Sequence, residues 1–158
     1  MEISIGVAAV TTLALSFVSA VLPWVNAEAI VIALPAIAHS PAQLAGLVVV
    51  VTVGQMAGKC VVYFAGRRGA RIGSGRMAER IATWQARAAG SPGRAVLLVA
   101  FSSVVGIPPF YVMSAIAGAV GMNLGWFLAA GTAGRLLRFS VLALGAFSLI
   151  PLDPYPQP

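Results

Sequence analysis

The sequence predicts an all-α protein, a polytopic membrane helical bundle that contains two inverted, proline-broken hairpins. Three observations lead to this class. Of the 158 residues, 59% are hydrophobic and 9% are charged, whereas about 25% of a soluble domain is charged. Two apolar stretches, 16–36 and 100–120, are interrupted by proline. Most basic residues lie in one segment between the apolar stretches. With so few charged residues, we do not expect a water-exposed exterior.

The first element is an apolar block over about 3–37, with breaks at Pro23 and Pro35. Its second part, 25–38, has roughly 14 residues and would span about 21 Å as a helix, less than the roughly 30 Å of hydrocarbon. A backbone break at membrane depth survives only where it lines a cavity or is packed in protein. We therefore expect a re-entrant or half-length helix here.

A spanning helix is expected next, over 42–66. It carries a GxxxG motif at Gly54 and Gly58, which allows close approach of another helix. These elements form the first half of the chain, residues 1–66. No basic residue precedes the apolar N-terminal block, so we expect an uncleaved membrane segment rather than a signal peptide.

The segment 67–94 is predicted to be a basic cytoplasmic loop. It holds seven of the ten basic residues, namely Arg67, Arg68, Arg71, Arg76, Arg80, Arg87 and Arg94. Such clustering between hydrophobic spans is the positive-inside signal, so the net charge of +6 predicts topology rather than nucleic-acid binding. Within the loop, the pattern over 77–89 indicates either a short amphipathic helix at the membrane interface or an ordinary solvated loop helix.

The second half, 95–150, repeats the pattern of the first. After a turn at 90–93, a short helix over 95–106 is expected, then a break at Pro108 and Pro109, then another short helix over 111–121. Asn123 opens a last spanning helix that runs to about 150. Residues 1–150 therefore form one integral membrane domain, and 151–158 form a proline-rich tail.

The two halves predict an inverted repeat. In each, a broken hairpin precedes a full span, and Gly58-Lys59 is echoed by Gly134-Arg135. If the basic loop is cytoplasmic, the two hairpins enter the membrane from opposite sides. Interrupted segments at corresponding positions of two halves indicate the binding site of a secondary transporter.

Four ionisable residues lie within the apolar segments: Glu28, Lys59, Arg135 and Arg138. Such a charge costs about 2.5–3.5 kcal/mol on insertion scales and is a functional candidate by default. Glu28 could couple transport to protons, or could pair with Lys59 or Arg135 to hold the bundle together.

Arg135 and Arg138 are three residues apart and share one helix face. Near the bilayer midplane they would suit an anionic headgroup, because the guanidinium fork matches phosphate. If the helix begins later, both arginines would instead lie at the interface.

No catalytic or metal-binding pattern appears in the sequence. Cys60 and His39 are single, which leaves no disulfide and no thiolate cluster. A nucleophile–base set, a phosphate-binding loop and a dinucleotide fingerprint are also missing from the sequence. We expect neither an enzyme nor a cofactor or metal site.

Several short motifs resemble the DedA family, also called the VTT or SNARE-associated membrane-protein domain. They are LPWVNAEA, VGQMAGK, YFAGRRG, IPPFYVMSAIAG and GRLLRF, between about residues 16 and 140. The resemblance implies two facing re-entrant hairpins and the transport of lipid headgroups, polyprenyl-phosphate or phospholipid, across the membrane with protons as a candidate coupling ion. It makes Glu28 the membrane-embedded acid and places Arg135 and Arg138 in a Gly-Arg-x-x-Arg element.

The chain departs from that family around Pro108. Many members carry arginines there, whereas this sequence has Ser102, Ser103, Gly106, Phe110 and Tyr111. Two alternatives to a flippase stay open, a non-transporting membrane scaffold and a small ion or drug exporter. In each case we expect the protein to lie in the inner or plasma membrane with membrane lipids as partners. A homo-oligomer is compatible with each alternative.

Overall fold

The computed structural model describes residues 5–22, 25–38, 40–72, 75, 79, 82–83, 85–86 and 90–149. Within these ranges every regular element is helical, which confirms the all-α prediction. Two helices, α3 (Pro41–Ile72) and α7 (Leu124–Leu149), are long and apolar enough to cross a membrane.

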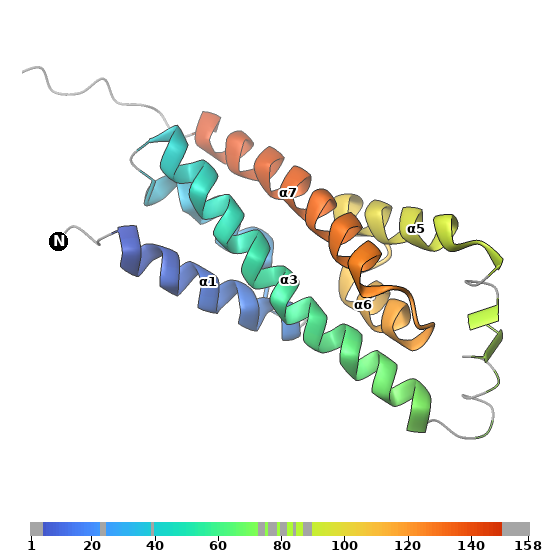
Figure 1. Cartoon of the computed structure of the whole chain (residues 1–158). Coiled ribbons are helices and arrows are strands. Elements are labelled where there is room, and N and C mark those ends of the chain that lie inside the picture. The colour runs from blue at the N-terminus through green and yellow to red at the C-terminus, as the bar shows by residue number, and fades with distance from the viewer. Residues whose placement is uncertain are drawn as a thin grey trace, which may run out of the picture.

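Each long helix follows two shorter ones. α1 (Ile5–Val21), α2 (Ala27–Ala33) and the 3₁₀ helix η1 (Leu34–Ala36) precede α3, and α5 (Pro92–Val105) and α6 (Phe110–Ala119) precede α7. In Figure 1, α3 and α7 run in opposite directions. α1 leads toward the middle from the end where α3 begins, and α5 does so from the end where α7 begins (Figure 1).

The two halves pack on each other reciprocally. α1 lies against α3 and α5 lies against α7, but α2 packs on α7 and α6 packs on α3. Each short second helix therefore lies on the long helix of the other half. The two halves are therefore joined by crossed contacts between their elements.

Two predicted boundaries are corrected by the structure. α3 continues to Ile72 rather than ending near 66, so Arg67 and Arg68 lie on the helix, where they are exposed. Arginine is a good helix former, and the turn at Gly66 is held against α6. α5 begins at Pro92 rather than 95, because proline is favoured in the first turn of a helix.

Some predictions fall on residues outside the described ranges. These are the break at Pro23, the residue His39, most of the expected helix over 77–89, and the tail 151–158. On either side of Pro23, α1 ends at Val21 and α2 begins at Ala27. The other predicted break lies within the described part, since Pro108 and Pro109 separate α5 from α6.

Glycines set the closest helix contacts. A Cβ on Gly54 would lie 2.7 Å from the Leu13 carbonyl oxygen of α1, and one on Gly58 would lie 2.7 Å from the Phe17 carbonyl oxygen. The GxxxG face is therefore used within the chain, against α1. On the far half of α3, a Cβ on Gly118 of α6 would overlap the Tyr63 carbonyl group.

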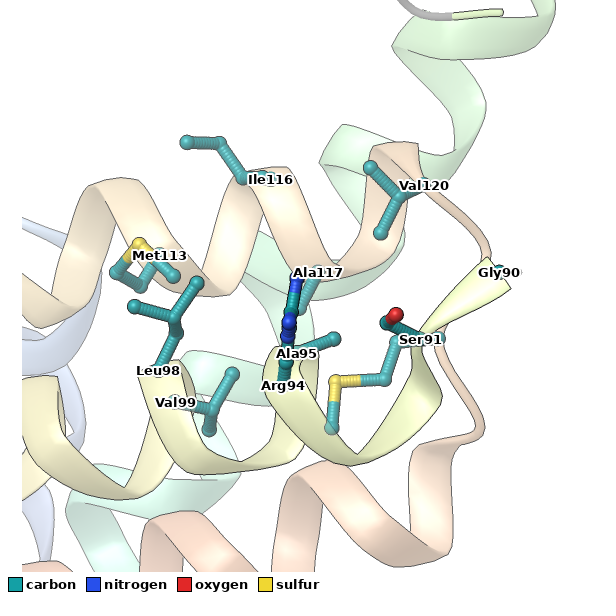
Figure 2. Close-up of a pocket in the computed structure, with 11 residues that line it drawn as sticks. Gly90, Ser91, Arg94, Ala95, Leu98, Val99, Met113, Ile116, Ala117 and Val120 are labelled. Carbon is teal, nitrogen blue, oxygen red and sulfur yellow. The ribbon is translucent and has the colours of Figure 1, made fainter. Parts of the chain in front are cut away.

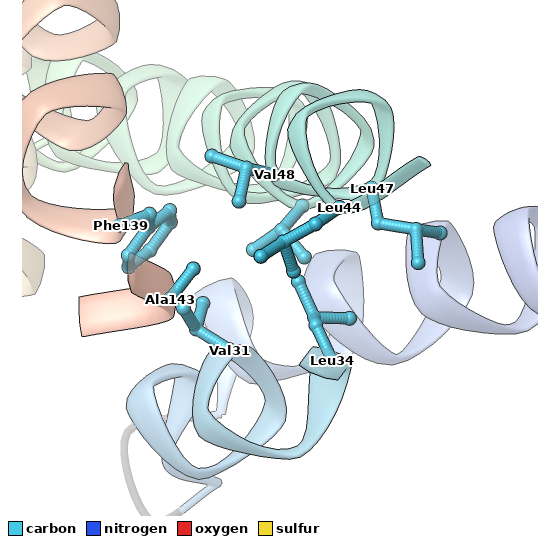
Figure 3. Close-up of a cluster of buried hydrophobic side chains, with 8 residues drawn as sticks. Val31, Leu34, Leu44, Leu47, Val48, Phe139 and Ala143 are labelled. Atoms are coloured by element: carbon cyan, nitrogen blue, oxygen red, sulfur yellow. The ribbon is translucent and has the colours of Figure 1, made fainter. Parts of the chain in front are cut away.

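Two apolar clusters fill the bundle, one on each side of its middle. Figure 3 shows the first, where Val31 and Leu34 meet α3 and α7. Its buried members are Val31, Leu34, Leu44, Leu47, Val48, Val51, Phe139 and Ala143. The second is built around Phe127 of α7, whose ring stacks on Tyr63 and Phe110 at centroid distances of 5.2 and 6.0 Å.

Large apolar side chains also cover the outside of the bundle. Among them are Val10 on α1, Leu97 on α5 and Leu144 on α7, each more than 60% exposed. Soluble monomers rarely expose apolar surface over such an extent. The outward faces, together with the two long apolar helices, indicate a membrane protein.

Replacing Gly118 with alanine should destabilise the bundle by about 1–3 kcal/mol, because overpacking forces backbone shifts and the added methyl group would overlap the Tyr63 carbonyl. Thermal unfolding in detergent measures the change. Gly46→Ala is the matched control, since a Cβ at Gly46 of α3 meets no atom within 4 Å. Equal melting temperatures for the two variants would contradict this packing.

Candidate functional site

Glu28 lies in the first turn of α2, just after the break. The Asn26 side chain caps this helix, because its Oδ1 accepts a hydrogen bond of 2.8 Å from the Glu28 backbone amide. The free amides at a helix start favour a carboxylate there. Local sequence alone therefore places an acid at the inner end of the first hairpin.

Glu28 pairs with Arg138 of α7. The carboxylate Oε1 accepts hydrogen bonds from Arg138 Nε, at 3.1 Å, and from Nη2. Of the partners expected for this acid, Lys59 and Arg135, neither is the one found. The reason is the packing of α2 on α7, which puts the start of α2 beside the residue one turn beyond Arg135.

Arg138 also reaches the second hairpin. Its Nη1 donates a hydrogen bond of 2.7 Å to the carbonyl oxygen of Val104, in the last turn of α5. Gly106, the C-cap of α5 with φ of 84°, makes room for this contact, because a Cβ there would lie 3.2 Å from Nη1. One guanidinium thus joins α2, α5 and α7.

The break at Pro108 and Pro109 lies next to this contact of Arg138 with α5. Gly106 and the prolines free the last carbonyl groups of α5, one of which is taken by Arg138. Ser102 Oγ donates a hydrogen bond of 2.5 Å to the carbonyl oxygen of Pro108, and Pro109 is the N-cap of α6. Pro108 and Pro109 thus lie between the end of α5 and the start of α6.

Lys59 plays the corresponding part in the first half. Its side chain is buried, and Nζ donates a hydrogen bond of 2.7 Å to the carbonyl oxygen of Ala20 in the last turn of α1. Nζ also lies 5.0 Å from the centre of the Tyr111 ring. Glu28 and Tyr111 are each the second residue of their helix, so Lys59–Tyr111 mirrors Arg138–Glu28.

The repeated Gly-Lys and Gly-Arg dipeptides pair Lys59 with Arg135. In the structure, however, the residue equivalent to Lys59 is Arg138. Both cations donate to a carbonyl in the last turn of the first helix of their own half, and both face the start of a short helix from the other half. Arg138 lies three residues beyond the aligned position. The hairpin geometry, rather than the Gly-Arg dipeptide, decides which cation takes the role.

Arg135 lies between these two groups. It is the twelfth residue of the 26-residue helix α7, roughly 17 Å along it. Its guanidinium carbon lies 4.8 Å from the Phe110 ring centre and 5.3 Å from that of Phe139. The buried Nε has no hydrogen-bond partner. Within the described residues, no acid pairs with it.

The cluster carries excess positive charge. Lys59, Arg135 and Arg138 are three cations and Glu28 is one acid, so 3 − 1 leaves two formal positive charges. Excess charge at a helix middle is costly unless an anion or solvent compensates it. The arrangement can hold an anion on the guanidinium group of Arg135, with Arg138 released or retained by Glu28.

Gln55 is a polar neighbour that the sequence analysis did not identify. It is buried and donates from Nε2 to the Ser16 carbonyl oxygen, at 3.1 Å, and to Ser19 Oγ. Gln55 lies four residues before Lys59, on the same face of α3. The four-residue spacing of Gln55 and Lys59, together with two serines three residues apart on α1, could have indicated a row of polar side chains that leads to Lys59.

Comparison of the chain with family models, with curated proteins and with solved structures found no match. Within the described ranges, no group of three or more His, Cys, Asp or Glu side chains could hold a metal ion.

Arg138→Met should lower the free energy of unfolding by about 1.5–3 kcal/mol, the usual contribution of charged hydrogen bonds, because it also leaves Glu28 unpaired. Arg135→Met should change it by no more than about 1 kcal/mol, since only contacts with two rings are lost. Chemical or thermal unfolding in detergent compares the two variants. Equal losses would show that Arg135 has a protein partner that the geometry lacks.

Proposed function

We propose that this chain is a small membrane transporter that moves lipid headgroups across the membrane through the central charged cluster. The observation that carries the proposal is Arg135, a half-buried arginine in the middle of a long apolar helix, whose buried Nε has no hydrogen-bond partner. A protein that only needed stability would gain by replacing such a group with an apolar residue. A negatively charged substrate supplies a reason for keeping it.

The proposed architecture is a pair of re-entrant hairpins that enter from opposite membrane faces. α1 and α5 have 17 and 14 residues, and α6 has 10. At 1.5 Å per residue, none of these reaches across about 30 Å of hydrocarbon. Lys59 and Arg138 hold carbonyl groups in the last turns of α1 and α5, which suits helices that break at the midplane of a transporter.

In the proposed cycle, Glu28 controls Arg138. When Glu28 takes up a proton, its charge attraction for Arg138 is lost, and the guanidinium can join Arg135 in binding an anionic headgroup. When Glu28 loses the proton, the ion pair forms again and the headgroup is displaced. The ionised Glu28 carboxylate and the headgroup would then compete for Arg138, so that proton uptake by Glu28 favours headgroup binding, which is a simple means of coupling.

Membership in the DedA family is part of the proposal. The aromatic residues at the positions where many members carry arginine are the ones that contact cations here, since Phe110 lies beside Arg135 and Tyr111 beside Lys59. Positive charge is thus brought to the second hairpin from α3 and α7. This supports an anionic substrate despite the departure. The same proposal places 67–94 in the cytoplasm and the chain in the inner or plasma membrane.

A membrane scaffold is the second candidate, and the Glu28–Arg138 pair favours it because the charges already bind within the chain. The small-residue faces argue against it. Gly54 and Gly58 are covered by α1, Gly131 by Met56 and Phe110, and Gly134 by Ser103. Those faces are occupied by this chain and are not free for partner helices.

Translocation in proteoliposomes tests the transport proposal. Wild type should move a fluorescent phosphorylated lipid between leaflets, and Arg135→Met should lose at least about ten-fold in rate, the equivalent of about 1.4 kcal/mol, while its melting temperature stays near that of wild type. Glu28→Gln should lose the response to a pH gradient. The matched control is Arg68→Gln, an exposed arginine on α3 outside the cluster.

If wild type moves no phosphorylated or unphosphorylated lipid, the flippase proposal fails. If Glu28→Gln also dissociates an oligomer or unfolds the chain, the scaffold becomes the better account. Transport of ions or drugs that does not depend on any lipid headgroup would support the exporter.

Reporter fusions test the inverted hairpins. A reporter placed at Ser91, where α5 begins, and one placed at the C-terminus should lie on opposite faces of the membrane, because α7 separates them. Accessibility to a membrane-impermeant thiol reagent, with single cysteines at the same two places, is the measurement. The inverted repeat would be refuted by both positions on one face.

A further inference from the structure

A cavity in the bundle lies away from the charged cluster, between the arms of the second hairpin. It has a volume of about 520 Å³ and is bounded by the first turns of α5 and the last turns of α6. Figure 2 shows Leu98 and Val99 of α5 on one side, with Met113 and Ala117 of α6 on the other. Small-molecule sites occupy about 300–1,000 Å³ and are mostly apolar, so the volume and lining suit a ligand.

The chemistry of the cavity changes along its length. The part toward the middle of the bundle is apolar, whereas Arg94 and Ser91 line the part at the start of α5. Arg94 is exposed, and no acid pairs with it in the part of the chain that the structure describes. From Met113 to Val120 the lining follows α6 for about 10 Å, the length of the upper part of an acyl chain.

We propose that this cavity, the α5–α6 groove, binds a phospholipid of net negative charge, with part of one acyl chain between the helices and the phosphate at Arg94. Three features of the structure support this occupant. The groove lies between two helices too short to span the bilayer, its floor is apolar, and its polar end carries an unpaired cation.

This site is separate from the proposed transport path. Arg94 belongs to the first turn of α5, whereas Arg135 and Arg138 lie at the middle of α7. Binding in the groove does not require that the central cluster move anything. A lipid held here would keep the arms of the second hairpin apart at their outer end while Gly106 and the prolines join them at the tip.

Photolabelling of the full chain in vesicles tests the proposal. The probes are phosphatidylglycerol and phosphatidylcholine, each with a diazirine in one acyl chain, in vesicles of unlabelled phosphatidylcholine. We expect phosphatidylglycerol to label residues between Gly90 and Met122 in preference to α1 and α7. Arg94→Gln should reduce that labelling about five-fold, the effect of one arginine near an anionic headgroup, and should leave phosphatidylcholine labelling unchanged.

A second variant separates the acyl site from general lipid contact. Ala95→Phe, which fills the groove, should reduce labelling by both lipids, whereas Leu97→Phe, on the outward face of α5, should not. Labelling spread evenly over all exposed helices, or an Arg94→Gln variant with undiminished labelling by phosphatidylglycerol, would overturn the proposal. Headgroup translocation measured on the same Arg94→Gln protein keeps this result distinct from the transport test.

Discussion

The Arg138 guanidinium is the interaction on which the middle of the bundle depends. It joins the carboxylate of Glu28 at the start of α2 to the carbonyl group of Val104 at the end of α5, so the tips of both hairpins are held from α7. A hairpin tip inside an apolar bundle exposes backbone groups that need partners. Arg138 supplies one such partner to the second hairpin and Lys59 supplies one to the first.

Two kinds of contact hold the helices of the bundle together. Glycines allow backbone-to-backbone approach where helices of one half or of opposite halves cross, as at Gly58 with α1 and Gly118 with α3. Cations and aromatic rings meet at the centre, where Arg135 lies beside Phe110 and Phe139 and Lys59 lies beside Tyr111. The first kind of contact brings the helices close, and the second kind places the charged groups between them.

The two halves share an order of packing but differ in chemistry. Glu28 and Tyr111 hold equivalent places, yet one is an acid that pairs with Arg138 and the other is a ring beside Lys59. The two hairpin tips therefore differ in chemistry, with an ion pair at the first and a contact between a cation and an aromatic ring at the second.

The sequence alone determined the helical class, the two long apolar helices, the break at Pro108 and Pro109, and the four charged residues within apolar segments. Composition and periodicity are local properties, so these features could be predicted from the sequence. The end of α3 could not be predicted in this way, because its extension to Ile72 accompanies the packing of Gly66 against α6.

Only the tertiary structure decided which charges meet. The pairing of Glu28 with Arg138 spans 110 residues of sequence and follows from the packing of α2 on the long helix of the other half. The same packing left Arg135 between two aromatic rings with its Nε unpaired. Partner choice depends on the register between helices distant in sequence, which the spacing of residues along one chain does not contain.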